Sequence, residues 1–383
     1  MLGVYIHIPF CKTICSYCDF CKMHYNEKFV SSYLTHLEKE IHARYKGEPV
    51  NSIYIGGGTP SCLTVNELDH LLSILTIFNL TDNYEYTIEC NIENIDIDKL
   101  NIFKSYGINR LSIGVESFDK DNITILSRHH DEDMVFDNIY LAKKYFNNIN
   151  IDLIYGVSPN IDKVKNDISK FLMLDIPHIS CYSLILEEHT KLWIDKQKYI
   201  PEELDKEMFD YINDTLTKNG YIHYEISNYA KEGYESIHNK NYWLNGKYYG
   251  FGLSAVSFLD RHRISNTKNL TKYLDDNYIE EDNYESNLVS KENDLILGLR
   301  LIEGIDIDKY NNTWHTSILE NPTIKELIND KTILVAISYV DSELGIRQNI
   351  KEIRKIISSY PKCLFHVDAT QAIGKIKIDF NDM

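Results

Sequence analysis

Short runs of β-branched and other apolar residues alternate with longer amphipathic stretches over about the first 220 residues of the chain. The runs that predict strands are residues 4–8, 52–55, 86–89, 110–115, 150–155 and 178–184. The stretches that predict helices are residues 27–45, 64–78, 98–105, 131–146, 161–172 and 201–218. Because strands alternate with helices, the pattern predicts an α/β fold whose parallel sheet is covered by helices. About six βα units make a partial (β/α)6 barrel rather than a closed eight-stranded one.

The regular alternation of predicted strands and helices ends after residue 220. Residues 221–228 predict one more strand, and a connection rich in Gly, Asn and aromatic residues follows over 236–252. A charged stretch near 275–285 precedes a predicted helix at 291–301. These features predict a small α+β region after the barrel.

The sequence pattern changes a second time near Glu320. The pair Asn321-Pro322 interrupts the chain, and a new βαβ-like pattern begins after it. We therefore expect three parts, which are residues 1–235, 236–318 and 319–383, and the last of them is an added α/β segment.

The overall composition narrows the class of protein. The 383-residue chain carries a formal charge of −17 and has a pI of about 5.3, which argues against a nucleic-acid-binding protein. It contains no long apolar stretch and no signal-like start, so we expect no stable membrane insertion and a cytoplasmic location. Half of the eight cysteines lie in one loop, which fits a metal site in a reducing compartment better than a disulfide framework.

The cysteine loop directly follows the first predicted strand. Its residues Cys11, Cys15 and Cys18 have the C-x3-C-x2-C spacing with which radical S-adenosylmethionine (SAM) enzymes hold a [4Fe–4S] cluster, and Cys21 follows them. Three thiolates on four irons leave one iron open for the amino and carboxylate groups of SAM. Four half-cystines this close would pair with strain, whereas four thiolates also suit zinc, although structural zinc usually takes two separated C-x2-C pairs. Inert thiols are the remaining alternative.

A glycine-rich turn, Gly56-Gly57-Gly58-Thr59-Pro60, follows the second predicted strand. Glycines let the backbone approach a ligand closely, because no Cβ stands in the way. The turn lacks both the lysine and the glycine spacing of a phosphate loop. It is therefore either a plain tight turn or, one strand after the cysteine loop, a holder of the amino group of SAM.

Three acidic residues lie in or at the ends of predicted buried strands. Glu89 ends the third strand, Glu116 ends the fourth, and Asp152 interrupts the apolar fifth. Burying an acid costs several kcal/mol unless it is paired or bound to something. The alternatives are structural ion pairs, for which Arg128 is the available cation, and a shared cavity in which these acids bind the ribose and amino groups of a ligand.

Four ordered motifs carry a resemblance to a known family. They are Tyr5-x-His7-Ile8-Pro9-Phe10-Cys11, Gly56-Gly57-Gly58-Thr59-Pro60, Asn109-Arg110-Leu111-Ser112-Ile113-Gly114-Val115-Glu116-Ser117-Phe118 and Asp152-Leu153-Ile154-Tyr155-Gly156. Over about residues 1–310 the chain resembles the coproporphyrinogen-oxidase-like branch of the radical SAM superfamily. The resemblance implies a radical SAM core over residues 1–235 and a truncated C-terminal region over 236–318.

The resemblance also implies roles for individual residues. It places Cys11, Cys15 and Cys18 on the cluster, and Tyr5, Gly58 and Glu89 around SAM. The residues that match a further ligand site in this branch are Tyr17, Thr59, Glu116, Arg128, Asp152 and Ser183. The family usually has Gln at the position of Glu116.

Two activities within this branch compete. The oxygen-independent coproporphyrinogen III oxidases carry a long N-terminal extension and a C-x3-C-x2-C-x-C pattern, whereas this chain reaches Cys11 after a few residues and has two residues before Cys21. Its Cys18-Asp19-Phe20 and His238-Asn239-Lys240-Asn241-Tyr242-Trp243 resemble the haem chaperones of the branch. That resemblance implies that the protein binds haem, with His238 in contact with it, and hands it to an unknown acceptor. The oxidative decarboxylase stays the alternative, and whether the protein is an enzyme stays open.

The last segment resembles a different family. Residues 330–375 resemble part of the pyridoxal-phosphate domain of cysteine desulfurases, of the class V aminotransferase fold. The resemblance implies that Asp368 pairs with the pyridinium nitrogen and Gln371 with the ring oxygen. The lysine that forms the Schiff base lies beyond the matching fragment, so we expect no desulfurase activity.

Overall fold

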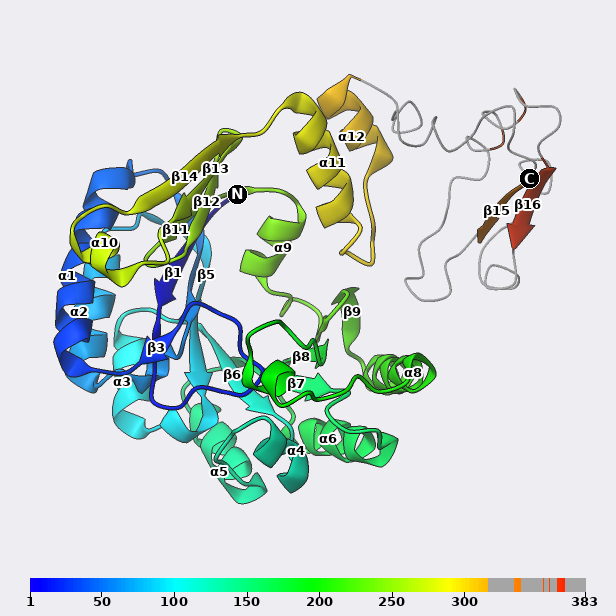
Figure 1. Cartoon of the computed structure of the whole chain (residues 1–383), viewed down its shortest axis with the longest axis horizontal. Coiled ribbons are helices and arrows are strands. Elements are labelled where there is room, and N and C mark those ends of the chain that lie inside the picture. The colour runs from blue at the N-terminus through cyan, green and yellow to red at the C-terminus, as the bar shows by residue number, and fades with distance from the viewer. Residues whose placement is uncertain (316–333, 339–353, 355–357, 359–363, 369–383) are drawn as a thin grey trace. The chain divides into compact units, whose positions relative to one another are not determined.

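The computed structural model describes residues 1–315, 334–338, 354, 358 and 364–368 (Figure 1). The chain divides into two compact units, Met1–Ser290 and Lys291–Met383. In the part of the chain that is described, no helix is both long enough and apolar enough to cross a membrane.

A sheet of twelve strands forms the first unit. Its six parallel central strands follow one another in sequence order and are β1 (Leu2–Ile8), β4 (Val50–Gly57), β5 (Leu80–Asn91), β6 (Arg110–Glu116), β7 (Asn148–Tyr155) and β8 (His178–Ser183). Two further short strands, β2 (Phe10–Cys11) and β3 (Met23–His24), pair with each other beside the sheet. The predicted α/β class and the partial (β/α)6 barrel are confirmed.

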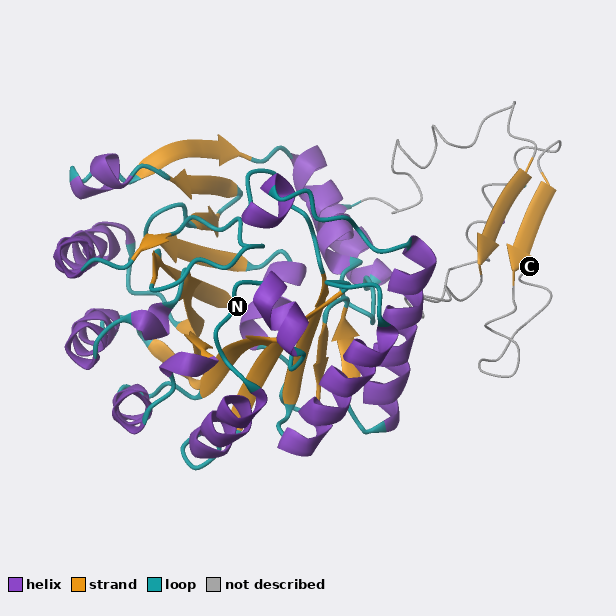
Figure 2. Ribbon diagram, turned by 60° about the horizontal axis from the view of Figure 1, so that its bottom comes forward, coloured by secondary structure: helices purple, strands orange, loops and turns teal. Residues whose placement is uncertain are grey.

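Helices cover the outer face of this sheet (Figure 2). They are α1 (Glu27–Arg44), α2 (Val65–Leu75), α3 (Ile97–Ser105), α4 (Lys120–Ile125), α5 (Glu132–Ala142), α6 (Ile161–Leu174) and α8 (Glu202–Lys218). The 3-10 turns η1 (Pro60–Cys62) and η2 (Ile92–Asn94) follow β4 and β5, and the short helix α7 (Lys191–Ile194) lies against the cysteine loop, where the Leu192 N–H donates to the Ser16 carbonyl. Polar caps fix where several of them begin. Thr64 and Glu67 form a capping box on α2, and Asp131 caps α5.

The two faces of the sheet differ in chemistry. Ile53 and Ile55 of β4 point toward the helices and are fully buried, as is Ile88 of β5. Because successive side chains of a strand alternate, Tyr54 and Glu89 point the other way. We call this second side the inner face. Most of its side chains are polar, and it carries the candidate site.

Residues after 235 extend the same sheet. Strand β11 (Lys247–Phe251) pairs in parallel with β1, and β12 (Val256–Leu259), β13 (His262–Asn266) and β14 (Ile279–Tyr284) continue the sheet from it. Helices α9 (Ile237–Trp243) and α10 (Leu270–Leu274) complete this region. The first compact unit therefore runs past the predicted boundary at 235, because β11 hydrogen-bonds to the first strand.

One local expectation also needs correction. The predicted strand at 221–228 is a pair of antiparallel strands, β9 (Ile222–Glu225) and β10 (Asn228–Ala230), which closes the other edge of the sheet. The charged stretch near 275–285 contains β14, an edge strand whose six residues are all exposed. Charged side chains are compatible with a strand there because the backbone makes the pairing, and they protect the edge from aggregation.

The second unit contains the end of α11 (Asn287–Gly298), α12 (Ile307–Trp314) and a pair of parallel strands, β15 (Leu334–Ser338) and β16 (Leu364–Asp368). In this unit, the indole of Trp314 donates to the Asp294 carboxylate at 2.7 Å. The predicted boundary between residues 318 and 319 lies outside the described residues, and so does Gln371. Asp368 is the last residue of β16.

Candidate functional site

A cavity of about 370 Å³ lies at the carboxyl ends of the parallel strands, beside the cysteine loop. The predicted site residues that line it are Cys11, Cys15, Tyr17, Cys18, Gly58, Thr59, Glu89, Glu116, Arg128, Asp152 and Ser183. Tyr5 and His238 are the two predicted site residues that do not line it. Residues far apart in sequence therefore meet where ligands bind in open α/β sheets.

The three predicted cluster cysteines all line this cavity. The Cys11 thiol lies 3.5 Å from the Thr59 hydroxyl, and the Cys15 sulfur lies 3.7 Å from Nη1 of Arg128. Burial raises the pKa of Cys11 to about 11 and also raises the pKa of Cys15 and Cys18. These thiols therefore carry protons in the free protein, and metal binding must displace them. Among the described residues, no group of three His, Cys, Asp or Glu side chains is arranged to hold a single metal ion.

The glycine turn packs against the cysteine loop. The backbone N–H groups of Gly58 and Thr59 donate to the carbonyls of Ile8 and Phe10, each at 2.8 Å. A Cβ on Gly58 would lie 2.8 Å from the Phe10 oxygen and 3.0 Å from the Cys11 sulfur. Only glycine permits this approach, so the turn fixes the loop and leaves its own backbone facing the cavity.

Glu89 and Asp152 are held by hydrogen bonds from neutral groups. The Glu89 carboxylate accepts from the Tyr54 hydroxyl at 2.8 Å and from the Gly57 N–H at 3.0 Å. Asp152 accepts from the Asn150 amide at 2.9 Å. Burial raises the pKa of Glu89 to about 7 and also raises the pKa of Asp152. Buried acids that face a cavity suit the cationic or hydroxyl groups of a ligand.

Glu116 sits at a β-bulge in β6. It has a positive φ of 66°, and its pairing with β7 shifts register there. Such a conformation costs about 1–3 kcal/mol in a residue other than glycine and is found mostly at functional sites. Burial raises the pKa of Glu116 to about 7, although Arg128 and a hydrogen bond from Tyr17 favour its ionised form. Gly114 makes room, since a Cβ there would lie 2.8 Å from the Glu116 carboxylate.

Arg128 joins the acids to the cysteine loop. Its guanidinium pairs with Glu93 at 3.4 Å, donates to the Gly114 carbonyl at 2.8 Å and reaches the Cys15 sulfur. The cation thus has a structural partner in Glu93, which sequence reasoning did not single out. Arg128 is 6% exposed, and its Nε has no hydrogen-bond partner among the described residues.

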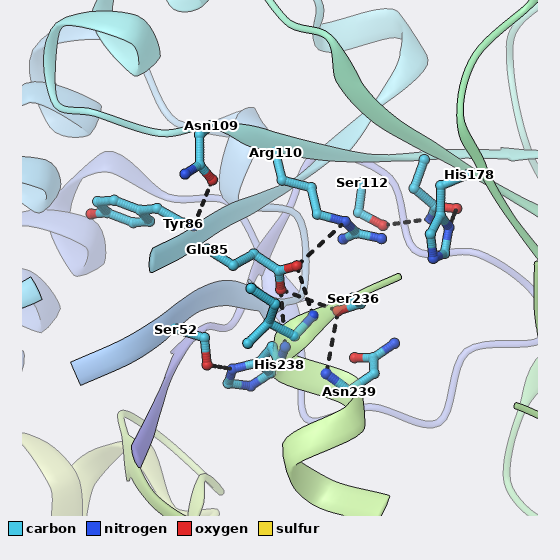
Figure 3. A network of polar contacts seen from close by, with 12 residues as sticks. Ser52, Glu85, Tyr86, Asn109, Arg110, Ser112, His178, Ser236, His238 and Asn239 are labelled. Carbon is cyan, nitrogen blue, oxygen red and sulfur yellow. Dashed lines mark hydrogen bonds and ion pairs between the residues drawn. The ribbon is translucent and has the colours of Figure 1, made fainter. Parts of the chain in front are cut away.

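His238 lies in a helix and is buried, whereas its sequence context suggested a loop. It belongs to α9 and is 2% exposed. Its ring hydrogen-bonds through Nδ1 to Ser52 at 2.9 Å and through Nε2 to Tyr242 at 3.0 Å. Figure 3 shows α9 with Ser236 and His238 turned toward the inner face of the sheet. The helix begins there because Ser236 caps it, accepting from the Asn239 N–H.

Tyr5 also lies behind the cavity. Its hydroxyl hydrogen-bonds to His7 at 3.0 Å, and its ring stacks on Tyr54 with centroids 6.3 Å apart. Sequence reasoning missed Tyr54, which stands between Tyr5 and Glu89. The available signal was a polar residue at every second position of an apolar run, as at Ser52 and Tyr54.

Comparison with known proteins decides the family. The radical SAM superfamily matches residues 5–168. The heme chaperone HemW of Lactococcus lactis is 38% identical in an alignment 344 residues long, which covers 86% of this chain and 90% of the relative. HemW of Bacillus subtilis is 34% identical in an alignment 368 residues long, which covers 90% of this chain and 97% of the relative. The chain belongs to the HemW family.

The HemW family assignment confirms the predicted branch. Among solved structures, coproporphyrinogen III oxidase (HemN) from Escherichia coli is similar, with a TM-score of 0.74 and 24% identity over 82% of this chain and 79% of that one. This likeness shows a shared fold. The class V aminotransferase family matches residues 279–383, which supports the resemblance of the last segment and begins earlier than the predicted residue 319.

Proposed function

We propose that the protein is a haem chaperone that binds one [4Fe–4S] cluster, SAM and haem and transfers haem to an acceptor protein. The observation that carries the proposal is the cavity, in which Cys11, Cys15 and Cys18 meet Glu89 and Asp152 in a chain of the HemW family. Its place of action would be the cytoplasm, and the acceptor is a protein of unknown identity. Nucleic acid is not among the expected partners of an acidic chain.

The residues present fit a cluster and SAM. Three thiols line one cavity beside a turn in which a Cβ on Gly58 would fill the space next to Cys11. When bound, the cluster supplies an iron with an open position for SAM. Cys11, Cys15 and Cys18 would hold it as thiolates. Cys21 would not take part, since it does not line the cavity.

The remaining cavity residues would orient SAM and a further ligand. Gly58 presents backbone groups, and Glu89 and Asp152 present acceptors for amino and hydroxyl groups. Tyr5 would act on this site only through Tyr54. The further ligand would meet Tyr17, Thr59, Glu116, Arg128 and Ser183, and the last of these donates to Asp205 at 2.7 Å.

A second candidate function is oxygen-independent oxidation of coproporphyrinogen III. The shared fold with HemN favours it, because the same cavity would serve either activity. One anaerobically reconstituted sample separates the two. We expect haem to bind at about one equivalent and no protoporphyrinogen to form from coproporphyrinogen with SAM and a reductant. Turnover of coproporphyrinogen would overturn the chaperone proposal.

The proposed organisation has three parts, with a core over residues 1–235, a HemW-type region over 236–318 and a class V aminotransferase-like segment over 319–383. The family matches support the first and the last of these. In the last segment Asp368 ends a strand that pairs in parallel with β15, which fits the expected βαβ-like pattern. The residues that match the family do not include the Schiff-base lysine, so we propose no pyridoxal-phosphate chemistry for them.

A further inference from the structure

The inner face of the sheet below the cavity is filled by helix α9, which contacts β1 and β4. A Cβ on Gly3 of β1 would lie 3.3 Å from the Asn241 amide and 3.4 Å from the His238 ring. The helix therefore packs directly on the strands. Its His238 lies in the segment that the sequence associates with haem, and yet the ring faces the protein interior.

We propose that α9 positions the cavity carboxylate Glu89 through contact of His238 with Tyr54, and that His238 supplies no ligand to haem iron. The proposal rests on the proposed binding of SAM in the cavity. It makes His238 and Tyr54 positioning residues, which act on SAM through Glu89.

The hydrogen bonds of His238 leave no free lone pair for iron. A neutral imidazole has one donor and one acceptor nitrogen, and here Ser52 and Tyr242 engage both. Burial lowers the pKa of His238 to about 3, which keeps the ring neutral. To coordinate iron, the ring would have to lose a hydrogen bond and α9 would have to leave the inner face.

The same ring connects directly to the cavity. His238 stacks on Tyr54 with centroids 5.1 Å apart and planes at 25°, and Tyr5 stacks on Tyr54 as well. The hydroxyl of Tyr54 donates to Glu89, and the other carboxylate oxygen accepts from Gly57. Removing His238 would leave the Tyr54 ring without one of these two stacking partners, and Glu89 would lose part of its orientation.

A second chain of contacts joins α9 to Asp152. The N–H of Ser236 donates to the Tyr224 hydroxyl at 3.3 Å, and Tyr224 hydrogen-bonds to His178 at 2.8 Å. His178 hydrogen-bonds to Asn150 at 2.7 Å, and Asn150 donates to Asp152 at 2.9 Å. Glu89 and Asp152 are thus both connected to the first turn of one helix.

Glu85 anchors the start of that helix. Its carboxylate accepts from the Ser236 hydroxyl at 3.1 Å and from the N–H groups of Ile237 and His238 at 2.9 and 3.1 Å. Arg110 lies 4.0 Å from it and is 2% exposed (Figure 3). A negative charge at a helix N-terminus is stabilising, so Glu85 fixes the place of α9. The polar side chains of the inner face near α9 therefore bind one another, and this arrangement does not require haem on His238.

The test compares SAM affinity and haem affinity in the same reconstituted variants. Tyr54→Phe removes one hydroxyl, and His238→Ala removes the stacked ring. Each should weaken SAM binding, measured by equilibrium dialysis, by about tenfold, because a hydrogen bond to a charged group is lost or misplaced. Iron content and the haem Soret titration should stay as in the unchanged protein. In combination with Glu89→Gln, Tyr54→Phe should cause little further loss.

Two matched controls isolate the positioning role. Tyr86→Phe removes a buried tyrosine hydroxyl on β5 that has no hydrogen-bond partner among the described residues. His223→Ala removes a half-buried ring that stacks on a tyrosine, Tyr229, with centroids 4.3 Å apart. Neither residue lines the cavity, so both variants should bind SAM normally.

The outcomes separate this inference from the proposed function. Unaltered SAM affinity in Tyr54→Phe, or loss of the Soret band in His238→Ala, would overturn the inference. If His238→Ala does not fold, Tyr54→Phe and its combination with Glu89→Gln still decide it. If the unchanged protein itself binds no SAM, the proposed function fails instead.

Discussion

The cavity has a rim, formed by the cysteine loop and the glycine turn, and a packed layer of residues beneath it, which we call the floor. The rim and the floor are built in different ways. At the rim, Cys11, Cys15 and Cys18 fall within eight residues, and the glycine turn is a single run. At the floor, Ser52 meets His238 across 186 residues and Glu85 meets Ser236 across 151. The rim presents chemical groups to a ligand, and the floor holds some of those groups in place. We therefore expect substitutions at the rim to abolish ligand binding and substitutions at the floor to weaken it.

The largest expected effect lies at the rim. Cys15→Ala should abolish iron binding after anaerobic reconstitution, because three thiolates are needed to hold the cluster. Cys11→Ala and Cys18→Ala should do the same, and Cys21→Ala should keep its iron. The iron content of each reconstituted variant tests this prediction. An equal loss of iron in Cys21→Ala would favour a four-thiolate site.

The next effect tests whether residues 236–290 share the stability of the core. Glu40 of α1 is fully buried and accepts hydrogen bonds from Asn266 and Tyr273, each at 2.7 Å, so it ties the first helix to β13 and α10. Glu40→Ala should lower the free energy of unfolding by about 3–5 kcal/mol, since Arg44 then loses its buried partner.

Urea denaturation measures this change, with Glu38→Ala as the control on the same helix. The Glu38 side chain is 45% exposed and lies 3.9 Å from His42, so its removal should change stability by less than about 0.5 kcal/mol. Two separate unfolding transitions in the unchanged first unit would contradict a single sheet that folds as one unit.

A smaller effect concerns the pH dependence of the free energy of unfolding, to which the buried Glu89 contributes. Burial raises the pKa of Glu89 from 4.5 to about 7 in the folded state. The folded protein therefore keeps this proton where the unfolded chain releases it, and Glu89 makes the protein less stable as the pH rises from about 4.5 to 7.

Glu89→Gln should remove this contribution. Relative to the unchanged metal-free protein, the variant should gain about 2 kcal/mol or less of unfolding free energy between pH 5 and pH 8. Urea denaturation at the two pH values measures the difference. A stability difference that does not vary with pH would show that Glu89 titrates normally.

The comparison of rim and floor also explains what the sequence could predict. Alternation of apolar runs located the six central strands, because that signal is local. Short motifs, strand ends and the family resemblance together located eleven cavity residues. The place of α9 was not predictable, since it depends on pairing of β11 with β1 and on hydrogen bonds across the sheet. For the same reason the sequence predicted a loop at His238 and did not show that the sheet continues to residue 284.

The last segment resembles part of a pyridoxal-phosphate-binding domain. Asp368 and Gln371 match residues that orient a pyridoxal ring, and the anchoring lysine lies outside the matching fragment. Incubation with pyridoxal phosphate should therefore give no stable absorbance band above 400 nm. A band that borohydride reduction abolishes would mean that a lysine of this chain anchors the ring.

The measurement that tests the central claim most directly is the electron paramagnetic resonance spectrum of the reduced, reconstituted protein with and without SAM. The account holds that three thiolates bind the cluster and leave one iron for SAM beside Glu89. It predicts a cluster signal whose shape changes on addition of SAM, in the Cys21→Ala variant as in the unchanged protein. A spectrum that SAM leaves unaltered, at a SAM concentration that saturates other radical SAM proteins, would contradict it.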